Sequence, residues 1–319
     1  MRLNDFEIAA LENNGSSRPM KANSPVTAMK LNNIVKQGAR ETAAAHLQFI
    51  KACIEAIGGD WSKARASGAK AVKSPTHHDC CHDDTNELID GTKEFTGLSL
   101  KVDHDINTAA ESLFQDLFGA SAALSEETII GKTLAQVINE SIQDGFAEAE
   151  KKWTERAKKY KEWAASNPFP DLPIEPTPEM SWLREIYNGG FTKVRNKVFQ
   201  QLTPLVKNAI AQGVANGKTI AEIAEGLYSQ HGSGYLWQWQ RLIRTESHNA
   251  AFNANLAEYE DTGAKAVRWS AAINACKLCQ GIQAHNLGYY AINAVPQPPH
   301  PNCRCHTTPV FSLPFGIVV

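Results

Sequence analysis

Four of the seven cysteines in this 319-residue chain lie close together near its C-terminus. They form two pairs, Cys276-Lys-Leu-Cys279 and the pair within His300-Pro-Asn-Cys303-Arg-Cys305-His306. A Cys-x-x-Cys turn places two sulfurs on one edge of a tetrahedron, and a second thiol-rich turn can supply the other edge. The C-terminal segment is therefore expected to fold around this cluster.

Zinc suits these donors, because its structural sites take four sulfur or nitrogen ligands. We expect four of five candidate ligands to bind Zn²⁺; the candidates are Cys276, Cys279, Cys303, Cys305 and His300. His300 is an alternative to Cys303, and His306 is a weaker substitute. With four protein ligands the site is structural, since no position is left for water. The alternative is four reduced cysteines that pack in a small core without a metal.

The remaining cysteines argue against a disulfide framework. They are Cys53 and the adjacent Cys80–Cys81, so the total is odd and the spacing uneven, whereas secreted domains usually carry an even number. A redox Cys-x-x-Cys would open a helix after a strand in a thioredoxin-like unit, and no such unit is predicted. Reduced thiols with a metal are the better interpretation.

A second His/Cys-rich segment, His77-His-Asp-Cys-Cys-His-Asp-Asp84, is also a metal candidate. Its donors are so close along the chain that adjacent side chains diverge. We expect a solvated loop with incidental metal affinity.

Composition excludes some classes of protein. The net charge is −2 and 43 % of residues are hydrophobic, so no global basic field favours nucleic acid. The sequence has no secretory signal and no run of about 18 apolar residues. We expect a soluble protein made in the cytoplasm, with no membrane partner.

A proline-rich segment at 167–178 is the clearest boundary, with five prolines in twelve residues. Such a stretch excludes helix and favours an extended linker. We therefore divide the chain into a helical N-terminal region (1–166) with an extended arm and a long helix, the linker (167–178), and a C-terminal domain (179–319).

Apolar periodicity predicts the N-terminal helices. Residues 1–26 are expected to form an extended arm, and 59–102 to be mostly irregular. The predicted helices cover 31–57, 106–118 and 129–162; the last has a break near Gly145 as its alternative. A helix of that length suits a strut or an oligomer contact.

The C-terminal domain is predicted to combine helices with two short strands. A helix over 182–202 is interrupted at Gly189–Gly190, another covers 205–217, and Thr219-Ile-Ala-Glu222 is a capping box. Further helix is expected over 235–259, and strands over 264–271 and 307–310. The fold class is mainly α, with long helices in the N-terminal half and a C-terminal α+β lobe that carries the zinc-knuckle-like cluster.

Three polar residues on the helix over 235–259 could carry chemistry: Arg244, Glu246 and His248. Arg244 and His248 are four apart and share a helix face, which suits phosphate or carboxylate binding. We favour a buried ion-pair network that locks this helix to the thiol-rich lobe.

The order of these motifs resembles a known family. It runs from Pro204–Ala224 through Arg241-Leu-Ile-Arg-Thr-Glu-Ser-His248 and Trp269 to Cys276-x-x-Cys279 and Pro298-Pro-His-Pro-Asn-Cys-Arg-Cys305. This is similar to the phage head morphogenesis family, the Mu F or SPP1 gp7-like minor head proteins of tailed phages. The likeness covers roughly residues 190–310. One departure is Lys277, where the family often has proline.

The resemblance implies a minor capsid component that is associated with the portal and acts in procapsid assembly or in DNA packaging and delivery. It implies no catalysis, a place in the virion head near the portal, and the host cytoplasm during assembly. Expected partners are the portal protein, then major capsid or scaffolding protein and packaged double-stranded DNA. The alternatives are a zinc-knuckle nuclease of the HNH type and a DNA-binding protein. An HNH nuclease needs a paired acid or histidine beside the knuckle to hold a catalytic metal, and no acid lies beside His285 or His300.

Overall fold

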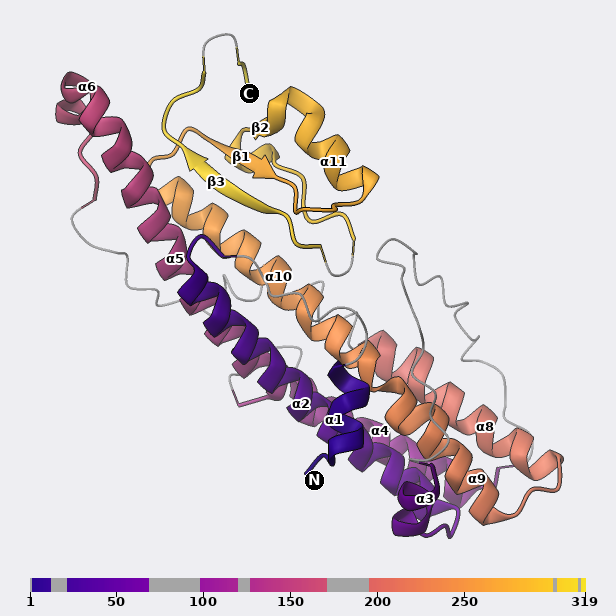
Figure 1. The fold of residues 1–319 in the computed structure, drawn as a ribbon. Helices are drawn as coiled ribbons and strands as arrows, with labels where there is room; N and C mark the ends of the chain where they lie inside the picture. The colour runs from indigo at the N-terminus through magenta and orange to yellow at the C-terminus, as the bar shows by residue number, and fades with distance from the viewer. Residues whose placement is uncertain are drawn as a thin grey trace. The chain divides into compact units, whose positions relative to one another are not determined.

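The computed structural model describes residues 2–12, 22–68, 98–119, 127–170, 195–300, 303–314 and 317–319. The described chain is mainly helical, with a three-stranded sheet near the C-terminus, which confirms the predicted fold class (Figure 1). It divides into two compact units, each assembled from segments that are distant in sequence. Unit 1 comprises Met1–Ser17, Lys36–Lys132 and Tyr187–Ile243; unit 2 comprises Arg18–Val35, Thr133–Ile186 and Arg244–Val319.

The elements have the following bounds. The helices are α1 (Asp5–Glu12), α2 (Pro25–Ala56), α3 (Trp61–Gly68), α4 (Leu100–Phe118), α5 (Ile129–Lys159), α6 (Lys161–Ser166), η1 (Asn196–Leu202), α8 (Thr203–Ala215), α9 (Ile220–Gly226), η2 (Leu227–Gly232), η3 (Ser233–Tyr235), α10 (Leu236–Asp261), α11 (Lys277–Ala284), η4 (His285–Gly288) and η5 (Ile292–Ala294). The strands are β1 (Ala266–Ser270), β2 (Tyr289–Tyr290) and β3 (His306–Val310). Residues 171–194 lie outside the described residues, so the domain boundaries at 166 and 178 stay a prediction.

In unit 1, the segment expected to be an extended arm contains a helix. Asn4 caps α1: its side-chain oxygen accepts the Glu7 N–H at 2.9 Å, and the Glu7 carboxylate accepts the Asn4 N–H at 2.9 Å. This reciprocal pair is a capping box. The arm prediction was therefore wrong for residues 5–12, because their cap was not recognised.

Glu7 also joins α1 to the rest of unit 1. Its buried carboxylate accepts two hydrogen bonds from Arg65 on α3, at 2.8 and 2.6 Å, and one from the Tyr228 hydroxyl at 2.9 Å. Burial, followed by the negative charge of Glu7, raises the pKa of Tyr228 well above its ordinary value. The carboxylate therefore has a complete set of donors, which a buried charge requires.

The interval predicted to be irregular also contains helix in unit 1. Gly58 ends the α2 segment with φ +78, and the Asp60 carboxylate then accepts the Lys63 N–H at 3.1 Å to start α3. Helix α3 packs on α9. The capping box predicted at the start of α9 is confirmed, since Thr219 and Glu222 bond reciprocally.

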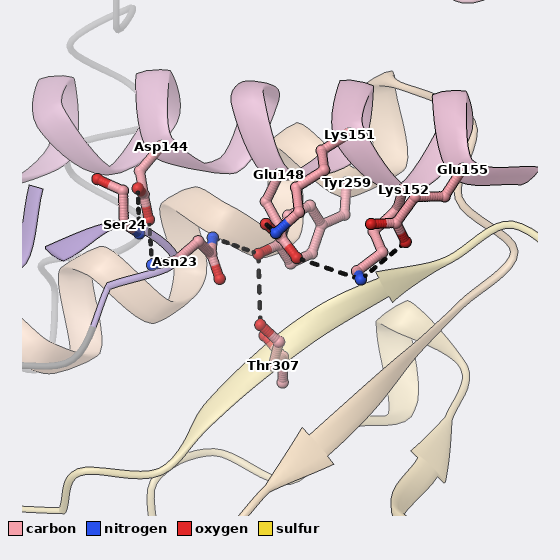
Figure 2. A network of polar contacts seen from close by, with 9 residues as sticks. All are labelled: Asn23, Ser24, Asp144, Glu148, Lys151, Lys152, Glu155, Tyr259 and Thr307. Carbon is pink, nitrogen blue, oxygen red and sulfur yellow. Dashed lines mark hydrogen bonds and ion pairs between the residues drawn. The ribbon is translucent and has the colours of Figure 1, made fainter.

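In unit 2, the carboxylate of Asp144 holds the start of α2. It accepts the backbone N–H groups of Asn23 at 2.6 Å and Ser24 at 3.1 Å (Figure 2). Ser24 is the N-cap, since its hydroxyl accepts the Thr27 N–H at 3.0 Å, and Pro25 takes the first helical position. Helix α2 therefore begins six residues before the predicted start, at a Ser-Pro signal.

The same network reaches the sheet of unit 2. The Asn23 amide donates to the Tyr259 hydroxyl at 3.0 Å, and that hydroxyl donates to the Thr307 carbonyl at 3.3 Å (Figure 2). Tyr259 is fully buried on α10, so both polar contacts are shielded from water. They tie α10 to strand β3.

Helix α5 runs without a break through Gly145 for 31 residues, and α6 follows it separately. The alternative of two helices that break near Gly145 was wrong. A Cβ at this position would lie 2.9 Å from Asn255 Oδ1 and 3.2 Å from Glu258 Cγ, both on α10. The glycine therefore allows α5 and α10 to approach closely within unit 2, and this packing outweighs the low helix propensity of glycine.

Glu258 gives this helix contact a pH dependence. Burial, followed by the charge of Asp261, raises its pKa from 4.5 to about 7. Between pH 4.5 and pH 7 the Glu258 carboxyl is therefore protonated in the folded protein and ionised in the unfolded chain. The protonated carboxyl contributes its full stabilisation below pH 4.5, and this contribution is lost as the pH rises through 7. We expect Glu258→Gln to flatten the fall in stability between pH 5 and 8, measured by urea unfolding. Glu260→Gln, on an exposed neighbour, should keep the slope of the parent protein, and equal slopes for both variants would contradict the assignment.

The sheet of unit 2 has the order β2-β1-β3 and is antiparallel throughout. Trp269 on β1 pairs with Thr307 on β3, and Val267 with Pro309. Both predicted strands are confirmed. Backbone groups alternate in direction along a strand. The Thr307 carbonyl bonds to Tyr259 and so points away from β1. Pro309, two residues later, has its backbone groups on the same outer side, and it has no N–H there.

Candidate metal site

The first thiol pair lies where α11 begins. Cys276 is the N-cap, in extended conformation, and Cys279 is a buried residue of the first turn. The sequence analysis expected a knuckle turn, but the turn continues into a helix. The N-terminus of a helix favours an anion and so supports a thiolate there. No thioredoxin-like unit surrounds it in the described part of the chain, since the strands belong to one antiparallel sheet.

The second group of donors lies on the segment that leads into β3. The Cys303 N–H donates to the His300 carbonyl at 3.2 Å, which forms a turn. Cys303 and Cys305 are both buried, and the alternation continues into Thr307. The two thiols therefore share the buried face of this segment, as their spacing predicts.

The structure brings all five predicted donors together. The ligand atoms of Cys276, Cys279 and His300 lie within 4.8 Å of one another, as do those of Cys279, Cys303 and Cys305. These five residues form what we call the thiol cluster, and Cys279 belongs to both groups. Its sulfur lies 3.2 Å from His300 Nε2 and 3.7 Å from Cys303 Sγ.

The separation between two of the sulfurs suits one edge of a tetrahedral site. Two sulfurs bound to zinc at about 2.3 Å are about 3.8 Å apart along a tetrahedral edge, close to the 3.7 Å between Cys279 and Cys303. The donors are reduced cysteines and a histidine, which zinc prefers. The thiol cluster could therefore bind a metal.

The thiols of the cluster interact strongly with one another. Hydrogen bonds from the thiols of Cys279 and Cys303 lower the pKa of Cys305 to about 2. The pKa of Cys279 is raised by the hydrogen bonds of the Cys279 thiol with Cys303 and Cys305, followed by burial. The three thiols therefore form one hydrogen-bonded group that stabilises a thiolate, the form in which cysteine binds a metal.

Carboxylates do not contribute to the metal candidates found among the described residues. Both groups of donors contain only cysteine and histidine. Oxygen ligands are typical of sites for Mg²⁺ and Ca²⁺, whereas thiolates select zinc and softer metals. The second candidate segment, His77–Asp84, lies outside the described residues, so its metal affinity stays untested.

The three polar residues of α10 are all buried in unit 2: Arg244, Glu246 and His248. Burial, followed by the charge of Arg304, lowers the pKa of Arg244. Burial lowers the pKa of His248 to about 4 and leaves a neutral imidazole, although the Cys305 thiol acts in the opposite direction. Their burial agrees with a structural role, and the ion-pair network itself stays a prediction.

The sequence analysis expected His248 to help join this helix to the thiol-rich lobe, but it did not indicate which residues of the lobe His248 faces. Its electrostatic neighbours include Cys305, His300 and His306. The only signal in the sequence is its position one helical turn before Phe252, a residue of the apolar core that also contains Cys279, Cys303 and Cys305. This position can be interpreted only once the packing of Phe252 in that core is known.

Across the residues that the structure describes, every helix is too short or too polar to cross a bilayer. Comparison of the chain with protein-family models, curated proteins and solved structures finds no match.

Proposed function

We propose that this chain is a minor head protein of a tailed phage, associated with the portal, that acts in procapsid assembly or in DNA packaging and delivery. The support is the order of its motifs, which resembles the phage head morphogenesis family. The observation that carries the proposal is that the later motifs lie in the same unit: Arg244-Thr-Glu246 on α10, the strand with Trp269 and both thiol pairs belong to unit 2, while Pro204–Ala224 lies in unit 1.

The metal of the thiol cluster is zinc in this proposal, with a structural role. Four of the five donors hold it, and Cys279 is the ligand that both groups share. Bound zinc joins the start of α11 to the segment before β3, two parts of the chain that also pack in one apolar core. A structural zinc contributes directly to the free energy of folding.

The proposed partners follow from the same assignment. The portal protein is the first of them, and the major capsid protein, scaffolding protein and packaged double-stranded DNA are secondary. The protein is placed in the virion head near the portal, and in the host cytoplasm during assembly. It has no catalytic role.

The alternatives are a zinc-knuckle nuclease and a DNA-binding protein. A hydrolytic metal centre keeps a coordination position open for water and usually recruits a carboxylate, whereas both groups of donors in the thiol cluster contain only cysteine and histidine. A DNA-binding protein would depend on phosphate contacts and so on salt, and the net charge of −2 gives no general attraction.

Quantitative mass spectrometry of virions and procapsids tests the assignment. We expect a few copies of this chain per particle in the phage that encodes it, and loss of those copies from particles assembled without the portal protein. Particles that lack the chain in both preparations would overturn the proposal. Cleavage of double-stranded DNA by the full chain with Mg²⁺ or Zn²⁺ would instead favour the nuclease.

A further inference from the structure

Nε2 of His248 and Nε1 of Trp269 are among the buried ring nitrogens of unit 2 for which the described residues offer no hydrogen-bond partner. His248 is 6 % exposed and Trp269 is 1 % exposed, so bulk water does not solvate them. Leaving a buried donor unpaired costs about 1–3 kcal/mol. What sets these two apart from other unpartnered nitrogens is their place in the lobe that contains the thiol cluster, which makes the cluster a candidate acceptor.

The strand register places Trp269 close to the second thiol pair. Trp269 pairs with Thr307, and Cys305 lies two residues before Thr307 on the same buried face. Diagonal neighbours on one face of an antiparallel pair lie about 7–8 Å apart, within reach of an aromatic side chain. The indole therefore lies within reach of the Cys305 thiol.

Helix α10 places His248 on the same side of the sheet. Phe252, one turn later, packs edge-on against Trp269 with ring centroids 5.8 Å apart, and its ring lies 6.5 Å from that of His248. Further along α10, Tyr259 bonds to Thr307. The helix therefore follows β3 back toward Cys305, and the electrostatic coupling of His248 to Cys305 agrees with this path.

Metal binding supplies the missing acceptors, because cysteine ligands are deprotonated when they bind a metal. A thiolate is an anion and a much better hydrogen-bond acceptor than a thiol. Three thiolates and one imidazole around a dication leave a net negative charge, which is costly in a buried lobe unless donors surround it.

We propose that His248, in the tautomer with its proton on Nε2, and Trp269 donate N–H···S hydrogen bonds to the metal-bound thiolates of the thiol cluster, with Cys305 as the nearest acceptor. Both are positioning residues, since they act on the metal through a ligand. The inference rests on the metal-binding part of the proposed function and is independent of the phage assignment. Partners of this kind typically change metal affinity about 10–100-fold.

The test uses the full chain loaded with Co²⁺, whose thiolate-to-metal charge-transfer band reports electron density on sulfur. Trp269→Phe removes the indole N–H and keeps most of the ring, and His248→Leu removes the imidazole. We expect each variant to shift the band to lower energy and to weaken Zn²⁺ binding about 10-fold or more, measured by competition with a chromophoric chelator. His248→Gln, which keeps an N–H, should recover part of both effects.

Trp239→Phe is the matched control. Trp239 is a fully buried tryptophan of unit 1 whose Nε1 also has no hydrogen-bond partner among the described residues. This variant should keep the parent band and affinity, which separates an effect on the metal from a general loss of stability. An unchanged band and affinity in both Trp269→Phe and His248→Leu would overturn the inference. A parent protein that gives no thiolate–cobalt band would overturn the metal site itself.

Discussion

Cys279→Ala is expected to remove the metal and unfold the C-terminal lobe of unit 2. Cys279 belongs to both groups of donors, so its loss leaves neither group complete. The binding free energy of a structural zinc is about 10–16 kcal/mol in small zinc domains, more than the net stability of most domains. We expect about one zinc per parent chain and much less than one per variant chain, by elemental analysis of protein purified without chelators. Near-ultraviolet circular dichroism of the buried Trp269 should be lost in parallel.

Cys53→Ala is the control for this result. Cys53 is also a fully buried, reduced cysteine, but it lies in unit 1 and outside the thiol cluster. Its replacement should cost about 1 kcal/mol, as expected for a small cavity, and leave the zinc content at the parent value. A Cys279→Ala protein with parent zinc content and an intact near-ultraviolet spectrum would show that the cluster does not hold a structural metal.

Arg65→Met is expected to destabilise unit 1 strongly. It removes two hydrogen bonds from the carboxylate of Glu7, whose side chain is fully buried. Removal of one partner from a buried ion pair costs about 3–5 kcal/mol, because the remaining charge is uncompensated. Since the Arg65 side chain is 24 % exposed, we expect a loss near the lower end, about 3 kcal/mol, in urea-unfolding experiments that follow far-ultraviolet circular dichroism.

The double variant Arg65→Met/Glu7→Gln separates this cause from lost packing. A neutral amide at residue 7 should restore a large part of the stability, since the penalty comes from the isolated charge. Lys63→Met is the surface control, because the Lys63–Asp60 pair is exposed and pairs of that kind contribute about 0–1 kcal/mol. If Arg65→Met cost no more than Lys63→Met, the buried carboxylate would not depend on its arginine.

The sequence predicted the helices with strong apolar periodicity, and it missed those that depend on short polar signals. The helix expected over 31–57 and the capping box at Thr219 were found, because several residues support each of them. Helices α1 and α3 were missed, although Asn4 and Asp60 are N-caps. A cap is one side chain, and in the sequence alone it does not differ from the polar residue of a loop.

The arrangement of the units was harder to predict than the helices. Each unit combines three separate segments, and a hydrophobic stripe shows which face of a helix is buried without showing what covers it. Gly145 illustrates the difficulty: in the sequence a mid-helix glycine suggests a break, whereas in the structure it is the point where α10 approaches. Only the tertiary contact distinguishes these cases.

The thiol cluster was largely predictable, because its spacing follows from the geometry of a tetrahedral ion. All five proposed donors lie within one small region. The sequence placed His248 in a network between its helix and this lobe, but which of the donors it faces depends on the path of α10 along β3 and was not predictable. The Cys-x-x-Cys pair was assigned correctly to the cluster, while its place at the start of α11 required the structure.

The outer side of β3 has a consequence for contacts with other chains. An edge strand normally offers free amides and carbonyls on which another chain can add a strand, and this is a common route to fibres and misassembly. Here Pro309 has no N–H to offer and the Thr307 carbonyl is already bonded to Tyr259. The β3 edge is therefore a poor template for strand addition, and we expect any contact that it makes with another chain to be made through side chains.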